Sequence, residues 1–267
     1  MEFITLTSGT KIPIIGSGTN TFGKENGVFS AEINFDTTEL ADAIALGYRH
    51  FDTAIVYRNE AVVGKAVKES GLPRTDFYLT SKAPADRLKN EADVRQAVQD
   101  SLAALETDYI DLYLIHHPWD NLAEIVAAWH ILEEYVDNGT FKAIGVSNFT
   151  EEQLGHLLSN SRIKPAVNQI ESHPGNWNDA IVAYSLANQV IPEAWGPLTR
   201  VSEKAQQTLA KIGEKYGKTW AQVALRYQIE RGVIVIPKSH NKERQALNLD
   251  LFDFALTDAE KATIKAL

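Results

Sequence analysis

The sequence contains no cysteine. That absence excludes disulfide frameworks, thiolate zinc sites, iron–sulfur clusters and cysteine nucleophiles, and it fits a reducing compartment. An excess of basic charge is also lacking, because 26 Lys and Arg stand against 35 Asp and Glu, a formal net charge of −9. This balance disfavours a surface built to bind nucleic acid phosphates, although a local basic patch is compatible with it. Any catalysis must therefore use side chains other than thiols.

Long hydrophobic runs are missing as well. No apolar stretch approaches the ~18 residues of a membrane span, and no basic region precedes an apolar one near Met1. We therefore expect a cytoplasmic, soluble protein without a membrane or nucleic acid partner. The composition, 44% hydrophobic and 23% charged, is that of a globular protein with a sizeable core. A length of 267 residues fits two domains or one α/β barrel of about 250 residues.

Short apolar runs rich in β-forming residues alternate with longer stretches of helical periodicity along the chain. The runs predict strands at residues 14–18, 50–52, 77–81, 110–115, 143–147, 166–170, 190–195 and 233–237. The stretches between them predict helices at 38–46, 60–70, 92–105, 123–138, 151–159, 179–187, 202–216 with 220–230, and 242–249. A hairpin of residues 3–6 and 11–15, joined across Ser8 and Gly9, precedes this repeat.

Eight evenly spaced strand–helix units favour a (β/α)8 barrel. A doubly wound sheet also alternates, but it rarely reaches eight units without an inserted domain. No linker or low-complexity tract interrupts the pattern. We therefore predict an α/β fold with one TIM barrel domain over residues 1–267, capped at one end by the N-terminal hairpin.

Polar residues follow nearly every predicted strand, where a barrel of this kind places its catalytic groups. A single Asp or Ser there is equally well explained by hydrogen bonds to turn amides. Lys82 is different, because an ammonium at the mouth of a closing barrel needs a partner, and Asp52 is the natural one. The residues in question are Asp52, Tyr57, Ser81, Lys82, His116, His117, Ser147, Asn148, Gln169, Glu171, His173, Glu193, Trp195, Lys238 and Ser239.

Four of these side chains together suit acid catalysis at a carbonyl oxygen. A free Tyr has a pKa of about 10, and lowering it by ~3 units requires ~4 kcal/mol of preferential stabilisation of the phenolate. For Tyr57 the ammonium of Lys82 can supply this, with Asp52 holding the lysine and His116 orienting the substrate oxygen. Without a nucleophile–base dyad, such a site suits proton transfer coupled to hydride transfer better than hydrolysis.

Metal catalysis is an alternative interpretation of the histidines. His50 with Asp52, and His116 with His117, resemble the ligands of metal-dependent barrel hydrolases. A complete site needs further ligands, and the later strands clearly offer only His173. We therefore expect no metal.

Five motifs carry a family resemblance. Residues 47–54 read GYRHFDTA and are followed by Tyr57, and LIHHP, GVSNF, NQIE and IPKS follow at 114–118, 145–149, 168–171 and 236–239. In this order the motifs resemble those of the aldo-keto reductases over essentially the whole chain. The segment EAWGPL at 193–198 is most similar to the bacterial diketogluconate reductase branch.

The resemblance implies a (β/α)8 carbonyl reductase that uses NADPH. Its catalytic residues would be Asp52, Tyr57, Lys82 and His116, with Tyr57 as the general acid. Its cofactor contacts would be Ser147, Asn148 and Gln169 at the carboxamide, Trp195 on the nicotinamide ring, Lys238, Ser239, Asn241 and Arg244 around the 2′-phosphate, Asn248 at the adenine, and Thr19, Gly196, Pro197, Leu198 and Arg200. Its substrate pocket would be walled by Phe22, Ile55, His117 and Trp119.

Several departures from the family pattern suggest an open, permissive pocket. Residues 199–201 run almost directly into a helix, so the cofactor clamp is short and we expect Arg200 to compensate electrostatically. Leu247 replaces a common adenine-contacting Glu, and the chain stops at Leu267 without the long C-terminal loop of many relatives. The long segment 22–35 is expected to form part of the pocket wall.

The resulting functional prediction is NADPH-dependent reduction of small aldehydes or ketones by a monomeric enzyme. The alternative is a barrel that binds NADPH as a redox sensor or partner-binding subunit with little turnover. Consumption of NADPH with a panel of small aldehydes discriminates between them.

Overall fold

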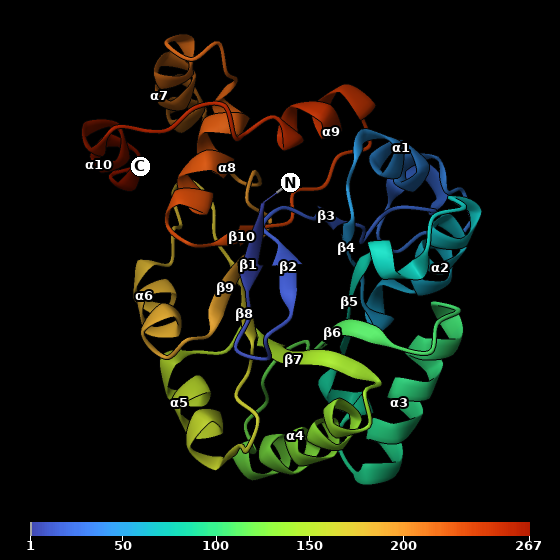
Figure 1. Ribbon diagram of the computed structural model, residues 1–267. Coiled ribbons are helices and arrows are strands. Elements are labelled where there is room, and N and C mark those ends of the chain that lie inside the picture. The colour runs from blue at the N-terminus through green and yellow to red at the C-terminus, as the bar shows by residue number, and fades with distance from the viewer. Residues whose placement is uncertain (1) are drawn as a thin grey trace.

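Eight parallel strands form the centre of the computed structural model, which describes residues 2–267. Their order, β10-β9-β8-β7-β6-β5-β4-β3, places consecutive strands side by side. The first and last strands also meet, because Ile15 forms a parallel bridge with Val235 and the Gly16 N–H donates to the Val235 carbonyl at 2.9 Å. The sheet therefore closes into the predicted (β/α)8 barrel (Figure 1). The strands are β3 (Ser17–Gly18), β4 (His50–Asp52), β5 (Tyr78–Ala83), β6 (Ile110–Ile115), β7 (Phe141–Ser147), β8 (Val167–Glu171), β9 (Ile191–Trp195) and β10 (Ile234–Val235).

Each strand of the barrel leads into a helix, and β9 and β10 each lead into two. Thr150, Thr219 and Thr257 begin their helices with reciprocal capping boxes, which fix the start of each helix locally. The helices are α1 (Thr38–Leu46), α2 (Glu60–Glu69), α3 (Glu91–Ala104), α4 (Leu122–Asp137), α5 (Glu151–Asn160), α6 (Asp179–Ala187), α7 (Glu203–Glu214), α8 (Trp220–Glu230), α9 (Lys242–Leu249) and α10 (Asp258–Lys265). Over residues 2–267, no helix combines the length and apolarity needed to cross a membrane.

Several elements differ from the sequence-based expectation. The strand predicted at 77–81 continues through Lys82 to Ala83, because its pairing with β6 extends that far. The strands predicted at 14–18 and 233–237 shrink to two residues each in β3 and β10. Pro237 lacks the N–H that a longer ladder requires, although its carbonyl accepts from Gly18. Helix α10 was not among the predicted helices.

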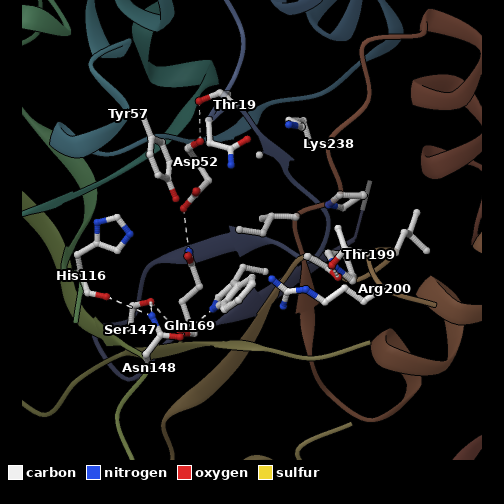
Figure 2. Close-up of a pocket in the computed structure, with 18 of the residues that line it drawn as sticks. Thr19, Asp52, Tyr57, His116, Ser147, Asn148, Gln169, Thr199, Arg200 and Lys238 are labelled. Atoms are coloured by element: carbon white, nitrogen blue, oxygen red, sulfur yellow. Dashed lines mark hydrogen bonds between the residues drawn. The ribbon is translucent and has the colours of Figure 1, made fainter. Parts of the chain in front are cut away.

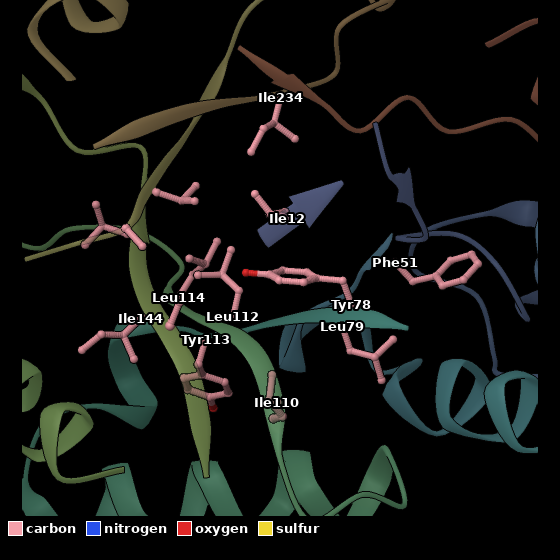
Figure 3. Close-up of a cluster of buried hydrophobic side chains, with 14 of the residues drawn as sticks. Ile12, Phe51, Tyr78, Leu79, Ile110, Leu112, Tyr113, Leu114, Ile144 and Ile234 are labelled. Atoms are coloured by element: carbon pink, nitrogen blue, oxygen red, sulfur yellow. The ribbon is translucent and has the colours of Figure 1, made fainter. Parts of the chain in front are cut away.

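The hairpin of β1 (Phe3–Thr5) and β2 (Lys11–Pro13) covers the end of the barrel where the strands begin. Its Ile12 is fully buried and lies over the barrel interior near Tyr78 (Figure 3). Thr7, in the turn of the hairpin, lines a second cavity together with Ala143, which lies near the start of β7. Since this end is plugged, the opposite end, at the carboxyl ends of the strands, is the one available for chemistry.

Candidate active site

A cavity of about 570 Å³ opens at the carboxyl ends of the strands (Figure 2). Most of the predicted site residues line it: Asp52, Tyr57, His116, His117, Thr19, Ser147, Asn148, Gln169, Trp195, Gly196, Pro197, Leu198, Arg200 and Lys238. It is also lined by residues that the sequence reasoning did not single out as binding residues, namely Gly18, Asn20, Thr199, Ile236 and Pro237. Ile236 and Pro237 belong to the IPKS motif, and the other three adjoin predicted site residues, so motif membership and adjacency were the available signals.

Lys82 lies directly beneath the cavity and joins two of its lining residues. Its Nζ donates to Asp52 Oδ1 at 2.6 Å, to the Thr53 carbonyl at 2.8 Å and to the Tyr57 hydroxyl at 3.4 Å. The side chain is completely buried, since β5 carries it into the barrel interior. Tyr57 ends a short 3₁₀ turn, Ile55–Tyr57, between β4 and α2. The structure therefore brings the predicted acid, ammonium and carboxylate into one connected chain.

The protonation states follow from burial and this pairing. Burial acts to lower the pKa of Lys82, but Asp52 and Tyr57 outweigh it and raise that pKa, so the lysine is charged. Burial raises the pKa of Tyr57 and exceeds the lowering by Lys82. The expectation that Lys82 brings the pKa of Tyr57 below its usual value is therefore wrong in this structure. Tyr57 is a neutral phenol that keeps its proton at neutral pH.

His116 contacts Tyr57 edge to face, with 5.6 Å between the ring centroids. Burial, with the charge of Lys82 and the neighbouring His117, lowers the pKa of His116 to about 2. The imidazole is therefore neutral near pH 7. In this state it can donate a hydrogen bond to a substrate oxygen but is a poor source of a proton.

Ser147, Asn148 and Trp195 form a second wall of hydrogen-bonded side chains. The Ser147 hydroxyl donates to the main-chain carbonyl of Gln169 at 2.9 Å, and the Trp195 indole N–H donates to Asn148 Oδ1 at 2.8 Å. Asn148 Nδ2 donates to the His116 carbonyl at 3.3 Å, which links this wall to the catalytic candidates. Asn148 adopts a left-handed φ of 62°, a conformation that Asn tolerates better than most residues.

Gln169 connects Asp52 to Glu193, a residue that the sequence reasoning placed among the polar strand-end candidates but gave no role. Its Nε2 donates to Asp52 Oδ2 at 2.8 Å and to Glu193 Oε1 at 2.5 Å. Glu193 is fully buried on β9. A Glu inside an otherwise apolar strand was the signal that could have marked it, because a buried carboxyl needs a partner.

The predicted 2′-phosphate residues are only partly brought to the cavity. Lys238 lines it and donates to Thr21 Oγ1 at 2.7 Å. Asn241 instead caps α9, where its side chain accepts from the Arg244 N–H at 2.9 Å, and Ser239 donates to the Asn241 carbonyl at 3.2 Å. Arg244 is exposed on the first turn of α9. The roles of Ser239, Asn241 and Arg244 stay predictions.

Two further adenosine-side positions lie on the same helix. Asn248 is buried, and Leu247 is 40% exposed on α9. Neither lines the cavity. Their proximity to an adenine ring is therefore still a prediction.

The segment after β9 is short, as expected, and Ser202 caps α7 by accepting from the Ala205 N–H. Arg200 lies on this segment at the cavity rim with a left-handed φ of 55°. Its guanidinium forms an ion pair with Glu171 at the end of β8. Only Nη1 contacts Glu171, so the guanidinium keeps N–H donors for the predicted contact with a cofactor phosphate.

The predicted substrate walls are mostly not at the cavity. Phe22 is completely buried and packs edge-on against His240, so its placement does not match the expected role of a pocket wall. Trp119 donates to Glu124 at 3.0 Å, and Ile55 packs against the core. Neither lines the cavity, whereas His117 does.

The long segment 22–35 does approach Tyr57, through Phe29. The two rings meet edge to face with 6.0 Å between their centroids. Lys24 Nζ lies 4.3 Å from the centre of the Phe29 ring and donates to the Phe29 carbonyl at 2.6 Å, while Arg58 donates to the Ala31 carbonyl at 2.9 Å. The segment therefore meets the candidate acid through Phe29, which no sequence motif marked, but none of residues 22–35 lines the cavity, so its role as a wall stays a prediction.

Three of the residues considered as metal ligands, His50, Asp52 and His117, have other partners, with Asn148 Nδ2 3.1 Å from His117 Nδ1. His50 Nε2 lies 3.2 Å from Thr80 Oγ1, and Asp52 is paired with Lys82. In the part of the chain from residue 2 to 267, no three His, Asp or Glu side chains are grouped so as to hold a metal ion.

The model of the aldo/keto reductase family matches residues 14–267. The chain belongs to this family of oxidoreductases. It is 38% identical over 266 residues to the glyoxal reductase of Bacillus subtilis, covering all of this chain and 92% of the relative. It is 37% identical over 277 residues to the morphine 6-dehydrogenase of Pseudomonas putida, covering 99% and 90%.

Among solved structures, an aldo-keto reductase of Bombyx mori in complex with NADP superimposes with a TM-score of 0.89 at 38% identity, covering 99% of this chain and 92% of that one. The predicted family and barrel are thus confirmed. Relatives of nearly equal identity are named for glyoxal and for morphine, so membership of this aldo-keto reductase family does not by itself specify the substrate.

Proposed function

We propose that this chain reduces aldehydes and ketones to alcohols with NADPH. The observation that carries the proposal is that the Asp52–Lys82–Tyr57 chain opens on the same cavity as the amide side chains of Asn148 and Gln169. These amides and the indole of Trp195 fit a nicotinamide carboxamide and its ring. When bound, the reduced nicotinamide supplies a hydride to the carbonyl carbon.

The residues of this chain would act on the carbonyl oxygen. Tyr57 donates its phenolic proton as negative charge develops on that oxygen, and Lys82 stabilises the phenolate that remains. Asp52 keeps Lys82 charged and fixed at 2.6 Å. Neutral His116 donates a hydrogen bond that orients the oxygen toward Tyr57.

Cofactor preference and substrate range complete the proposal. Lys238 and Arg244, with Ser239 and Asn241, would bind the 2′-phosphate and favour NADPH over NADH. Asn248 would contact the adenine. His117 and Phe29 would wall a pocket open enough for several small carbonyl compounds, and the enzyme would act as a monomer.

The test is NADPH oxidation with glyoxal, glyceraldehyde and benzaldehyde by the wild type and by Tyr57→Phe. We expect the variant to lose about 10²–10⁴-fold in kcat, because the proton donor is gone, while NADPH still binds. Tyr109→Phe is the matched control, since it removes a hydroxyl before the start of β6, outside the cavity. A loss of less than about tenfold in Tyr57→Phe would mean that another group is the acid. Tight NADPH binding without turnover of any aldehyde by the wild type would instead favour the sensor.

A further inference from the structure

The turn that carries Tyr57 is closed by a hydrogen bond between the residues on either side of it. The Thr53 hydroxyl, just after β4, donates to Asn59 Oδ1 at 2.9 Å. Asn59 directly precedes α2, and both residues are completely buried. The bond therefore joins the two ends of the stretch 53–59, with the 3₁₀ turn of Tyr57 between them.

Asn59 makes this bond in place of a local one. An Asn at the start of a helix usually accepts from an amide of the first turn, but the Asn59 side chain does not cap α2. Its Nδ2 donates to the Thr19 carbonyl at 2.7 Å and to the Phe22 carbonyl at 3.1 Å, so both amide hydrogens are used on the segment after β3. Since carbonyls only accept, the amide orientation is fixed, and Oδ1 is the atom that faces Thr53.

The backbone between Tyr57 and Asn59 is one that must be held in place. Arg58 has a left-handed φ of 60°, a conformation that costs free energy in a residue with a side chain and persists where its surroundings enforce it. The Tyr57 N–H donates to the Ala54 carbonyl at 3.0 Å, but that bond lies within the turn itself. The bond from Thr53 to Asn59 adds the connection across the turn, from β4 to the start of α2.

Thr53 also holds the cation on which Tyr57 depends. Its carbonyl accepts from Lys82 Nζ at 2.8 Å, while its hydroxyl holds Asn59. Lys82 Nζ reaches the Tyr57 hydroxyl at 3.4 Å, which is longer than the usual range of about 2.7–3.2 Å. Because this contact has little room to lengthen, a small outward shift of the turn would break it.

We propose that Thr53 and Asn59 are positioning residues for the proton donor, and that their hydrogen bond sets the distance between the Tyr57 hydroxyl and Lys82. The inference rests on the proposed function, because it concerns the proton that Tyr57 gives to the carbonyl oxygen. Neither Thr53 nor Asn59 lines the cavity. Loss of the bond should therefore slow proton transfer and leave cofactor binding unchanged.

The test compares Thr53→Val, which removes the hydroxyl at nearly the same volume, with Thr53→Ser, which keeps it. The turnover number kcat is measured with glyoxal at saturating NADPH in light and heavy water, and the dissociation constant of NADPH by quenching of Trp fluorescence. Misplacement of a reacting group by about 1 Å can cost ~10²-fold in rate, so kcat of Thr53→Val should fall about ten- to hundredfold at an unchanged dissociation constant. Its solvent isotope effect on kcat should increase, because proton transfer becomes the slow step. Thr53→Ser should keep the wild-type kcat and isotope effect.

Thr107→Val is the matched control, because its hydroxyl donates to the Tyr109 carbonyl at 3.0 Å before the start of β6, outside the cavity. We expect it to leave kcat and the isotope effect unchanged. If the wild type turns over no aldehyde, the proposed function is wrong and the inference falls with it. If the wild type is active and Thr53→Val matches Thr53→Ser in kcat, the inference alone is overturned.

A purely structural role for Thr53 gives a different result. It would lower kcat in Thr53→Val with an unchanged isotope effect, or together with an equal loss of NADPH affinity, and either result overturns the inference. Thr53→Cys covers the case in which Thr53→Val does not fold. A thiol is a weaker donor than a hydroxyl, so this variant should have a lower kcat and a larger isotope effect than Thr53→Ser. Equal values in Thr53→Cys and Thr53→Ser would overturn the inference.

Discussion

The floor of the cavity and its rim are constructed from different parts of the chain. The floor consists of Asp52, Lys82, Gln169 and Glu193, all on strands and all buried, and each bonds to another of the four. The rim consists of exposed loop residues such as His117 and Arg200, and Phe29 and Arg244, which are also exposed but do not line the cavity, are placed with it as a prediction. Buried polar groups depend on their partners, because an orphaned one keeps its full desolvation cost. The floor should therefore tolerate no single change, whereas rim residues can vary one at a time.

The largest expected effect is that of Lys82→Met. It leaves Asp52 buried without its cation and removes the charge that stabilises the phenolate of Tyr57. We expect kcat/KM to fall by about 10²–10⁴-fold, and the free energy of unfolding in urea to fall by roughly 3–5 kcal/mol. Lys242→Met is the matched control, because its 2.6 Å ion pair with Asp42 lies on the surface. Equal stability losses in the two variants would remove the contrast between floor and exterior.

Arg244→Ala tests the rim by affecting cofactor choice alone. A charge-assisted hydrogen bond contributes about 1.5–3 kcal/mol, so the dissociation constant of NADPH should rise about tenfold or more. The dissociation constant of NADH and the kcat should stay the same, because Arg244 is exposed and does not line the cavity. Lys242→Ala, two residues earlier on α9, is the control variant. Equal affinities of the wild type for NADPH and NADH would contradict the assignment of the phosphate site.

The pH dependence of the free energy of unfolding tests the buried surroundings of the floor, where His50 lies beside Glu193. Burial lowers the pKa of His50 to about 3, whereas an unfolded His titrates near 6.5. Below pH 6.5 the unfolded chain binds a proton that the folded state does not. The contribution of His50 to the free energy of unfolding is therefore fully present above pH 6.5 and is lost progressively as the pH falls toward 3. Between pH 7.5 and 5.5, His50 should account for about 1.4 kcal/mol of the loss in unfolding free energy.

His50→Asn should reduce that loss by this amount in urea titrations at the two pH values. His156→Asn, on the exposed surface of α5, is the control for removal of a histidine. An unchanged pH dependence in His50→Asn would mean that His50 takes up its proton in the folded protein as readily as in the unfolded chain.

The smallest effect is expected from Phe29→Ala. Its ring lies against Tyr57 and is 47% exposed, so it can contact the side group of a bound carbonyl compound. Aromatic contacts contribute about 0.5–1.5 kcal/mol, which predicts a roughly two- to tenfold rise in KM for benzaldehyde and little change for glyoxal. Phe35→Ala, on the same segment and 50% exposed, is the control. An equal rise for both aldehydes would show that Phe29 supports the loop rather than the substrate.

The floor was more predictable from the sequence than the rim. Strand ends converge in a barrel, so Asp52 and Lys82 could be paired from their positions alone. Glu193 was among the strand-end candidates, and its facing the same side as Trp195 could have been predicted, because it lies two residues earlier and alternate residues of a strand face the same side. Phe22 and Phe29 could not be assigned in this way. Their directions depend on a segment with left-handed backbone at Asn26 and Phe35, which no periodicity encodes.

The seam between β3 and β10 has a consequence for how the protein acquires its site. Gly18 and Pro237 meet there, and both line the cavity. The cavity is therefore complete only when segments more than two hundred residues apart have come together. Contacts between such distant segments have the largest entropic cost of loop closure. In a refolding chain, recovery of cofactor binding should consequently report closure of the barrel, and it should lag behind the signals that follow helix formation.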